Sequence, residues 1–211
     1  MKKLIIIGAR GFGREVYDLA MSCIKAGADF EIKGFLDDKK DAFADYEGYP
    51  PIISSVENYI IQKDDVFTCA MGTPEWRKIY TEIILAKGGQ FITLISPMAT
   101  IRKNAHIGQG CIITHGSNIS VDTYISDHTA ILSSCLGHDV RIGMYSVLSG
   151  RVLLNGYVTI GDEAYLGCGA MVAPHKKIGD KAFVGIGSVV ISNVKAGAKV
   201  FGNPAKKWFF N

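Results

Sequence analysis

An aliphatic residue that recurs every six positions is the feature of this sequence that most constrains its fold. The repeat runs from Ile101 to Val190, and one interval, between Ile131 and Leu136, is five residues long instead of six. All sixteen repeat positions hold Ile, Leu or Val, a regularity that indicates a stacked repeat structure. These positions are Ile101, Ile107, Ile113, Ile119, Ile125, Ile131, Leu136, Ile142, Leu148, Leu154, Ile160, Leu166, Val172, Ile178, Val184 and Val190.

The residues around each repeat position indicate what one hexad forms. The side chain four positions later is mostly small or β-branched, as at Ala105, Cys111 and Thr123, and glycine often follows the aliphatic residue directly, as at Gly108 and Gly143. Because glycine tolerates positive φ, such hexads suit short strands joined by tight turns, with the aliphatic side chains stacked inward. Three hexads close one triangular coil, so this part of the chain predicts a parallel β-helix of about five coils.

Residues 1–95 show a different pattern, in which short apolar strands alternate with amphipathic helices. We predict strands over residues 3–7, 32–36, 66–71 and 91–95, and helices over residues 14–26, 54–61 and 74–87. Alternation of this kind predicts a parallel sheet covered by helices. Ser96 and Pro97 mark the linker, so we expect an α/β Rossmann-like domain over residues 1–95 and a β-helix domain with a C-terminal tail over residues 96–211.

The predicted helices have recognisable ends and apolar faces. Thr73 and Pro74 suit the start of the last helix, and Gly88 suits its end. Ser54 and Glu57 have capping-box spacing and predict the short middle helix. The apolar face of the first helix comprises Val16, Leu19, Ala20, Cys23 and Ile24. The apolar face of the last helix comprises Trp76, Ile79, Tyr80 and Ile83.

Composition and charge exclude several classes of function. The chain has 23 basic and 20 acidic residues, and a net charge of +3 is too small and too scattered for a nucleic-acid or membrane surface. No apolar run approaches the roughly 18 residues that span a bilayer, and the N-terminal apolar run is too short for a signal peptide. The five cysteines lack CxxC spacing, which indicates reduced core residues and no metal site. We therefore expect a soluble cytoplasmic protein.

Three segments resemble one family, the hexapeptide-repeat acyltransferases. The (I/L/V)-G-x-x-(S/T/A)-x repeats are similar to the hexads of that family, whose parallel β-helix is left-handed. Residues 200–206, VFGNPAK, resemble the V-x-G-x-P-A-K segment that follows the β-helix in the family. Residues 8–13, GARGFG, together with Asp37 and Asp38, resemble the N-terminal domain of its sugar O-/N-acyltransferase branch. That branch includes sialic acid O-acetyltransferases and N-acetyltransferases of nucleotide-linked 4-amino sugars.

The resemblance singles out His138 as a catalytic base. Acyl transfer from a thioester needs a base for the acceptor's proton and a hydrogen-bond donor for the oxyanion, and histidine suits the first role. Residues 136–143 follow the five-residue interval and resemble the family's (E/G)-H-(D/E)-x-x-I-G, which implies that His138 is the base and Asp139 orients it. Neighbouring strand residues point to opposite faces, so Asp139 reaches His138 only where the backbone is irregular. By the same resemblance, Gly156 directs its backbone N–H at the thioester carbonyl.

Each of these roles has a plainer alternative. His138 is alternatively a surface histidine beside a solvated carboxylate, and Gly156 is alternatively a turn glycine. The remaining histidines match no motif and are expected in turns or at the surface; they are His106, His115, His128 and His175. The chain also departs from the family pattern, with Ile131–Leu132 in place of Asn-Thr and VLSG over residues 147–150 in place of the usual H-x-x-P-G region. These departures leave the identity of the substrate open.

The resemblance further implies two substrates. Acetyl-CoA would lie along the flank of the β-helix near Val147, Cys168 and Ile186, with Lys206 and Lys207 at its phosphates or, alternatively, as solvated lysines. A nucleotide sugar would bind the N-terminal domain, where a glycine-rich loop between strand and helix brings backbone N–H groups to phosphate. The implied positions are Arg10, Gly11, Phe12, Asp37, Asp38, Gly72 and Glu75. Because the G-x-x-G-x-G spacing differs from the dinucleotide pattern, the alternative is a structural lid with an empty pocket.

We therefore expect an acetyl-CoA-dependent acyltransferase that acts on an amino or hydroxyl group of a sugar, most directly a nucleotide-linked 4-amino sugar in surface-glycan biosynthesis. The alternatives are a sialic acid-type O-acetyltransferase and a non-enzymatic trimeric scaffold with a nucleotide-sensing domain. Outward apolar residues of the β-helix, such as Ile112, Val121, Val147 and Val189, indicate an interface. Family members are three-fold symmetric with the site between subunits, which implies a homotrimer.

Overall fold

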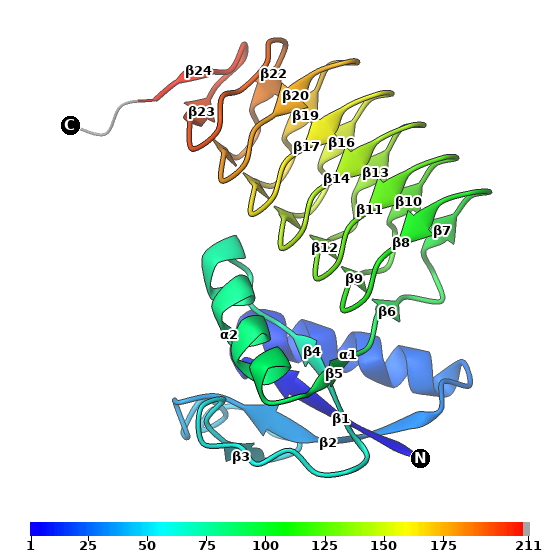
Figure 1. Cartoon of the computed structure of the whole chain (residues 1–211), viewed down its shortest axis with the longest axis vertical. Helices are drawn as coiled ribbons and strands as arrows, with labels where there is room; N and C mark the ends of the chain where they lie inside the picture. The colour runs from blue at the N-terminus through cyan, green and yellow to red at the C-terminus, as the bar shows by residue number, and fades with distance from the viewer. Residues whose placement is uncertain (209–211) are drawn as a thin grey trace.

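The computed structural model describes residues 1–208, which form a small α/β layer followed by a long β-solenoid (Figure 1). The strands of the N-terminal sheet are β1 (Lys2–Ile7), β2 (Phe30–Leu36), β3 (Ile52–Ser54), β4 (Asp65–Cys69) and β5 (Gln90–Phe91). They are parallel and lie in the order β3-β2-β1-β4-β5. In this doubly wound order the winding reverses between β1 and β4, and the crevice beyond their carboxyl ends is the usual ligand position.

Two helices accompany this sheet, and the sequence predicts the buried face of only one of them. α1 (Gly11–Lys25) buries Val16, Leu19, Ala20 and Cys23, which confirms the predicted face. α2 (Pro74–Ala86) begins after Thr73 as predicted, but it buries Pro74, Arg77, Thr81 and Ile84. Trp76 and Ile79 of the predicted face are exposed, because α2 packs against the solenoid as well as the sheet. No helix within residues 1–208 is long and apolar enough to cross a membrane.

The predicted helix over residues 54–61 does not form. Ser54 belongs to β3, where it pairs with Leu36 of β2, so its hydroxyl is not placed to cap a helix. The next serine closes a turn instead: the Asn58 backbone N–H donates to Ser55 Oγ at 3.3 Å. Pairing with the sheet edge therefore overrides the capping-box signal.

From residue 94 the chain winds through three sheets, one on each side of a triangular coil (Figure 1). The first face consists of β6 (Leu94–Ile95), β9 (Ile112–Ile113), β12 (Ala130–Ile131), β15 (Val147–Leu148), β18 (Tyr165–Leu166), β21 (Phe183–Val184), β23 (Lys199–Phe201) and the antiparallel β24 (Lys206–Lys207). The second face consists of β7 (Thr100–Ile101), β10 (Asn118–Ile119), β13 (Cys135–Leu136), β16 (Leu153–Leu154), β19 (Met171–Val172) and β22 (Val189–Val190). The third face consists of β8 (His106–Ile107), β11 (Tyr124–Ile125), β14 (Arg141–Ile142), β17 (Thr159–Ile160) and β20 (Lys177–Ile178).

The solenoid core is the stack of predicted aliphatic positions. Fourteen of the sixteen lie buried in one cluster, whereas Ile107 is partly buried and Ile101 is exposed. Both of these lie in the first coil, which has a neighbouring coil on one side only. The second face has six strands, one more than five coils would give. The predicted strand over residues 91–95 is divided, because Phe91 ends β5 and Leu94 starts β6, which pairs with β9 of the solenoid.

The first face packs on the N-terminal layer. Ile112, Ala130 and Val147 share a buried cluster with α1 residues such as Leu19 and Cys23. The prediction that Ile112 and Val147 belong to an exposed interface is therefore wrong, because the chain's own N-terminal layer covers them. This contact fixes the side on which the solenoid meets the sheet.

Candidate active site

His138 lies in the turn between β13 and β14, at the edge that joins the second face to the third. Asp139 follows it with a φ of 59°, in the left-handed region, and this is the irregular backbone that the predicted pair requires. The turn brings both side chains to the same side, so that His138 Nδ1 lies 2.9 Å from Asp139 Oδ2. Both side chains are about half exposed. The contact at Nδ1 leaves the opposite ring nitrogen, Nε2, to meet a substrate.

Gly156 lies against the imidazole ring from the next coil. A Cβ on residue 156 would stand 2.6 Å from His138 Cε1 and Nε2, which is closer than real Cβ contacts. Only glycine therefore allows the ring of His138 to keep this position. Within residues 1–208, the Gly156 N–H donates to no acceptor, so it is available to a bound group. The structure thus brings together the three predicted catalytic residues.

A cavity of about 500 Å³ in the N-terminal layer forms a second candidate site. It lies beyond the carboxyl ends of β1, β2 and β4, at the point where the winding of the sheet reverses. Residues of the first turn of α1 and of α2 border it, so the positive ends of two helix dipoles lie at its edge. Such an arrangement attracts phosphate groups.

Five of the seven predicted nucleotide-sugar residues line this cavity: Arg10, Phe12, Asp37, Asp38 and Gly72. Gly11 and Glu75 lie outside its lining. The cavity also includes Trp76 and Tyr80, which the sequence assigns to the core face of a helix. Burial raises the pKa of the Tyr80 hydroxyl, and the nearby Asp38 carboxylate acts in the same direction. The tyrosine therefore stands in the cavity as a neutral phenol.

Backbone contacts hold the mouth of the cavity in shape. Asp37 Oδ2 accepts the Ala9 N–H at 2.8 Å and Asp37 Oδ1 accepts the Lys39 N–H at 2.9 Å, so this carboxylate ties the loop after β1 to the loop after β2. A Cβ on Gly13 would stand 2.0 Å from the Gly8 carbonyl oxygen, so α1 can start this close to the strand only with glycine there. Asp37 therefore shapes the cavity that it lines.

The predicted acetyl-CoA residues fall into two groups. Cys168 and Ile186 are exposed in successive turns at the edge between the first and second faces, and Lys206 and Lys207 are exposed on β24 at the far end of the first face. Val147, in contrast, is 1% exposed and packs in the cluster with α1. The structure removes Val147 from the set of residues that can contact a ligand.

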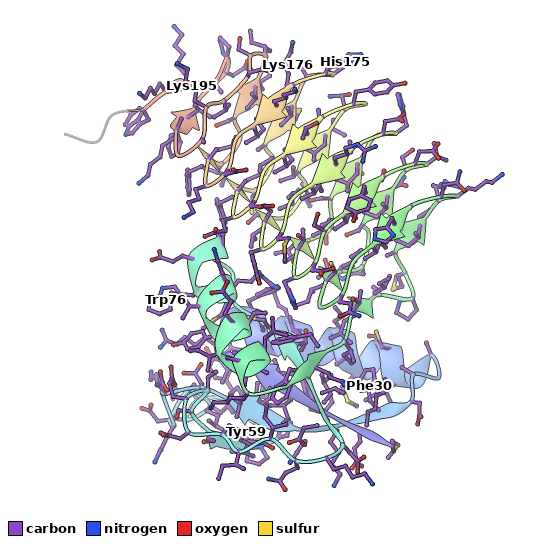
Figure 2. The ribbon with its side chains drawn as sticks, in the orientation of Figure 1. Phe30, Tyr59, Trp76, His175, Lys176 and Lys195 are labelled. Atoms are coloured by element: carbon purple, nitrogen blue, oxygen red, sulfur yellow. The ribbon has the colours of Figure 1, made fainter. Side chains whose placement is uncertain are left out.

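The candidate sites occupy separate sides of the chain. His138 lies at the edge between the second and third faces, Cys168 and Ile186 lie at the edge between the first and second, and the cavity lies in the layer beneath the first face. Figure 2 shows Trp76, which lines the cavity, on α2 of the N-terminal layer and His175, which lies two coils beyond His138 on the same edge, near the far end of the solenoid. The three candidate sites therefore lie on two different edges of the solenoid and in the N-terminal layer.

Two contacts that the sequence does not signal hold α2 against the solenoid. Arg77 is fully buried; its Nε donates to the Met71 carbonyl at 3.2 Å and its Nη1 donates to the His128 carbonyl at 3.3 Å. Beside it, Lys78 Nζ pairs with Glu163 Oε1 at 2.9 Å. Because α2 borders the cavity, these contacts set the position of the cavity relative to the solenoid. A charged residue on a helix is normally solvated, so neither contact has a sequence signature.

His128 lies in a turn, as predicted, but its side chain is buried and not at the surface. The residue is 5% exposed, and its ring stacks on Tyr145 at 5.4 Å and meets the Phe91 ring edge-on at 5.0 Å. Burial lowers the pKa of His128 to about 4, although the Asp127 carboxylate acts in the opposite direction. The imidazole is therefore neutral at physiological pH.

The cysteines divide between the core and the surface. Cys23, Cys69 and Cys111 are buried, as predicted, whereas Cys135 and Cys168 are exposed, contrary to prediction. All five are free thiols. In the part of the chain that the structure describes, no group of three or more His, Cys, Asp or Glu side chains is placed to hold a metal ion.

Comparison with known proteins identifies the relatives of the chain. Two family models match it, the PglD N-terminal domain over residues 3–84 and the GMPPB C-terminal domain over residues 91–189. The GDP-perosamine N-acetyltransferase of Escherichia coli O157:H7 is 32% identical over 170 residues, which are 79% of this chain and 76% of that protein. The UDP-N-acetylbacillosamine N-acetyltransferase of Bacillus subtilis (strain 168) is 34% identical over 117 residues, which are 54% of this chain and 51% of that protein.

The likeness extends to solved structures. The acetyltransferase domain of PglB from Neisseria gonorrhoeae FA1090, in complex with acetyl coenzyme A, superimposes with a TM-score of 0.87 at 29% identity. The match covers 98% of this chain and 99% of that domain, which confirms the predicted fold of a Rossmann-like layer followed by a left-handed parallel β-helix. The chain belongs to the hexapeptide-repeat sugar acyltransferases, in the branch that contains the GDP-perosamine and UDP-N-acetylbacillosamine N-acetyltransferases.

Proposed function

We propose that this protein transfers the acetyl group of acetyl-CoA to the amino group of a nucleotide-linked 4-amino sugar used in surface-glycan biosynthesis. The observation that carries this proposal is the His138–Asp139 pair held against Gly156, on a β-helix whose N-terminal layer contains a cavity of ligand size. The relatives that act on perosamine and bacillosamine nucleotides support it, as does the related domain that binds acetyl-CoA. We place the reaction in the cytoplasm, which fits five free cysteines.

His138 acts as the general base in this proposal. The amino nitrogen of the sugar attacks the thioester carbonyl carbon, the C–S bond breaks, and His138 Nε2 takes the proton that the nitrogen loses. The imidazolium then returns that proton to the departing thiolate. Asp139 accepts a hydrogen bond from Nδ1–H, which keeps Nε2 as the accepting nitrogen and stabilises the imidazolium. The Gly156 N–H donates to the carbonyl oxygen as negative charge develops on it.

The remaining site residues hold the two substrates. Acetyl-CoA supplies the activated acetyl thioester, and the exposed Cys168 and Ile186 form an edge along which it fits, with Lys206 and Lys207 near its phosphates. In the cavity, the Arg10 guanidinium and the two helix N-termini suit the diphosphate of a nucleotide sugar. Phe12, Asp37, Asp38 and Gly72 complete this part of the site. The division into residues 1–95 for the acceptor and 96–211 for acetyl transfer is part of the proposal.

The active form in this proposal is a homotrimer whose site is shared between chains. Support comes from the separate positions of the His138 edge, the Cys168 edge and the cavity. An outward apolar column on the second face gives further support; it consists of Cys135, Leu153, Met171 and Val189. Three-fold packing about this face would cover the column in every copy and bring the His138 edge of one chain to the ligand edge of its neighbour.

Steady-state kinetics test the proposal through thiol release from acetyl-CoA, with GDP-, UDP- and dTDP-linked 4-amino sugars as acceptors and sialic acid as a hydroxyl control. We expect His138→Ala to lower kcat by roughly 10²–10⁴-fold with little change in the KM for acetyl-CoA, and Asp139→Asn to lower it less. His106→Ala, at an exposed histidine on the third face, is the matched control. Full turnover by His138→Ala would overturn the assignment of the base.

The acceptor panel separates the alternatives. Thiol release with sialic acid alone would replace N-acetylation by O-acetylation. Nucleotide binding without turnover on any acceptor would favour the scaffold with a nucleotide-sensing domain. In either case calorimetry with acetyl-CoA shows separately whether the β-helix binds the donor.

A further inference from the structure

Three residues on the His138 edge occupy the same turn position in successive coils. Asp139, Tyr157 and His175 are each 18 residues apart, and their φ values are 59°, 60° and 60°. This left-handed conformation is uncommon for aromatic residues, and it directs the three side chains to the same edge of the solenoid. The ring of Tyr157 thus lies next to the catalytic pair, with the ring of His175 on its other side (the end of the solenoid that carries His175 is marked in Figure 2).

Tyr157 is held firmly between its two neighbours. Its ring meets the His138 ring almost perpendicularly, with centroids 5.0 Å apart and an interplanar angle of 85°. It stacks on His175 in parallel, at 4.7 Å and 8°. The Tyr157 N–H donates to the His138 carbonyl at 3.0 Å, and the His175 N–H donates to the Gly156 carbonyl at 3.0 Å. Backbone and side-chain contacts therefore hold the tyrosine ring in one position against the imidazole.

We propose that Tyr157 is a positioning residue that fixes the plane of the His138 imidazole; this rests on the proposed role of His138 as base. The imidazole has three neighbours: the Asp139 carboxylate at Nδ1, the Gly156 backbone on one side and the Tyr157 ring on another. Asp139 alone holds one ring atom and leaves rotation about that contact open. The Tyr157 ring prevents this rotation of the imidazole, so that Nε2 stays directed at the acceptor.

A structural role in stacking is the competing explanation, and the chain contains a matched control for it. Tyr124 on β11 stacks on His106 at 4.5 Å and 11°, and it is 43% exposed, compared with 49% for Tyr157. This second pair lies on the third face, and its ring contact is between Tyr124 and His106 alone, away from the turn that carries His138. Loss of the Tyr124 ring therefore reproduces the loss of an exposed tyrosine–histidine stack without a change beside His138.

The experiment measures kcat and KM for Tyr157→Ala, Tyr157→Phe and Tyr124→Ala in the full chain, with the acceptor that the wild-type protein uses. If the interaction energy of an aromatic pair of this geometry is lost from the transition state, the rate falls by roughly 2–10-fold. We expect Tyr157→Ala to lower kcat by that factor with both KM values unchanged. Tyr157→Phe and Tyr124→Ala should keep the wild-type kcat, because the first retains the ring and the second leaves the site intact.

A double substitution separates positioning from direct contact with substrate. If Tyr157 acts only through His138, Tyr157→Ala causes no further loss of rate in a His138→Ala background. A further loss there, a change confined to KM, or an equal loss in Tyr124→Ala would overturn the positioning role. If His138→Ala is itself fully active, the assignment of His138 as the base is wrong. That result comes from the single His138 variant and not from a Tyr157 variant, so the two failures are distinguishable.

Discussion

Replacing His128 by asparagine or phenylalanine should remove part of the acid-induced loss of stability that we expect of the wild-type protein. Burial lowers the pKa of His128 to about 4, whereas the unfolded chain has the ordinary value of about 6.5. Above pH 6.5 the imidazole is neutral in both states. As the pH falls from 6.5 towards 4, the unfolded chain binds a proton that the folded chain does not, so the unfolding free energy falls.

The size of the effect follows from the two pKa values. A difference of one proton between the folded and unfolded states changes the unfolding free energy by about 1.4 kcal/mol per pH unit. Over the interval from 6.5 to about 4 the loss amounts to about 3 kcal/mol, which is a large fraction of the stability of an ordinary domain. Burial of the ring beside Tyr145 and Phe91 is the largest cause of this lowering of the pKa; the Arg77 guanidinium acts in the same direction and the Asp127 carboxylate acts against it.

Urea unfolding at several pH values and one fixed protein concentration measures the effect. Carboxylates titrate in the same range, so the quantity to compare is the difference between each variant and the wild type. Asparagine suits the φ of 58° at residue 128, and phenylalanine retains a ring for the stack, so the two variants perturb the fold differently. His106→Asn, at an exposed histidine, should leave the pH dependence unchanged. Parallel curves for the wild type and both His128 variants would refute the reasoning.

Three further predictions follow from the contacts described above. Gly156→Ala should lower kcat at least about 10-fold in the thiol-release assay, because the added methyl displaces the imidazole of His138, the proposed base; a wild-type rate would show that the ring does not need this position. Arg77→Met should lower the unfolding free energy by about 1–3 kcal/mol in urea, since two carbonyls lose the donor of a fully buried side chain, whereas Lys78→Met, at a partly exposed side chain, should change it much less. Met171→Asp should give inactive monomers of 22.9 kDa in light scattering, whereas Lys177→Asp on the third face should keep the wild-type mass; an active Met171→Asp monomer would contradict the shared site.

The solenoid is predictable because its rule is local. Each hexad places its aliphatic residue inward whatever its distant neighbours do, so Ile125 and Leu148 are buried where the period puts them. The outward residues follow no such rule. Val147 and Val189 have the same pattern in the sequence, but the N-terminal layer covers the first and leaves the second partly exposed. A period in the sequence distinguishes inside from outside, and tertiary packing decides which outer face is covered.

The buried face of α2 could not be predicted for a related reason. An apolar stripe predicts burial of Trp76 and Ile79, but α2 is packed between its sheet and the solenoid, and the narrow contact buries Arg77 instead. The guanidinium donates to the Met71 carbonyl, six residues before Arg77, and to the His128 carbonyl, which belongs to a solenoid turn 51 residues away in the sequence. A hydrophobic pattern in the sequence does not predict a buried cation that donates its hydrogen bonds to backbone carbonyls.

The His138 motif predicts the contact between His138 and Asp139, but the five-residue interval before it does not explain that contact. The five-residue interval shortens the turn over residues 132–134, which lies at the edge between the first and second faces. His138 lies one strand later, and β13 and β14 pair in regular register with their neighbours. The irregular backbone that lets Asp139 reach the imidazole is therefore the left-handed turn itself, a feature that the solenoid repeats in most coils.

The position of α2 connects the stability of the chain to the proposed activity. In the proposed trimer the solenoids carry the contacts between chains, so a shared site requires the cavity of one chain to be held at a fixed place relative to its own solenoid. Arg77 and Lys78 provide that attachment, and the solenoid carbonyl that accepts a hydrogen bond from Arg77 belongs to His128. A change that loosens this contact should therefore raise the KM for the nucleotide sugar before it affects the KM for acetyl-CoA, whose proposed residues lie on the solenoid alone. The two KM values of Arg77→Met, measured below its unfolding transition, test this order directly.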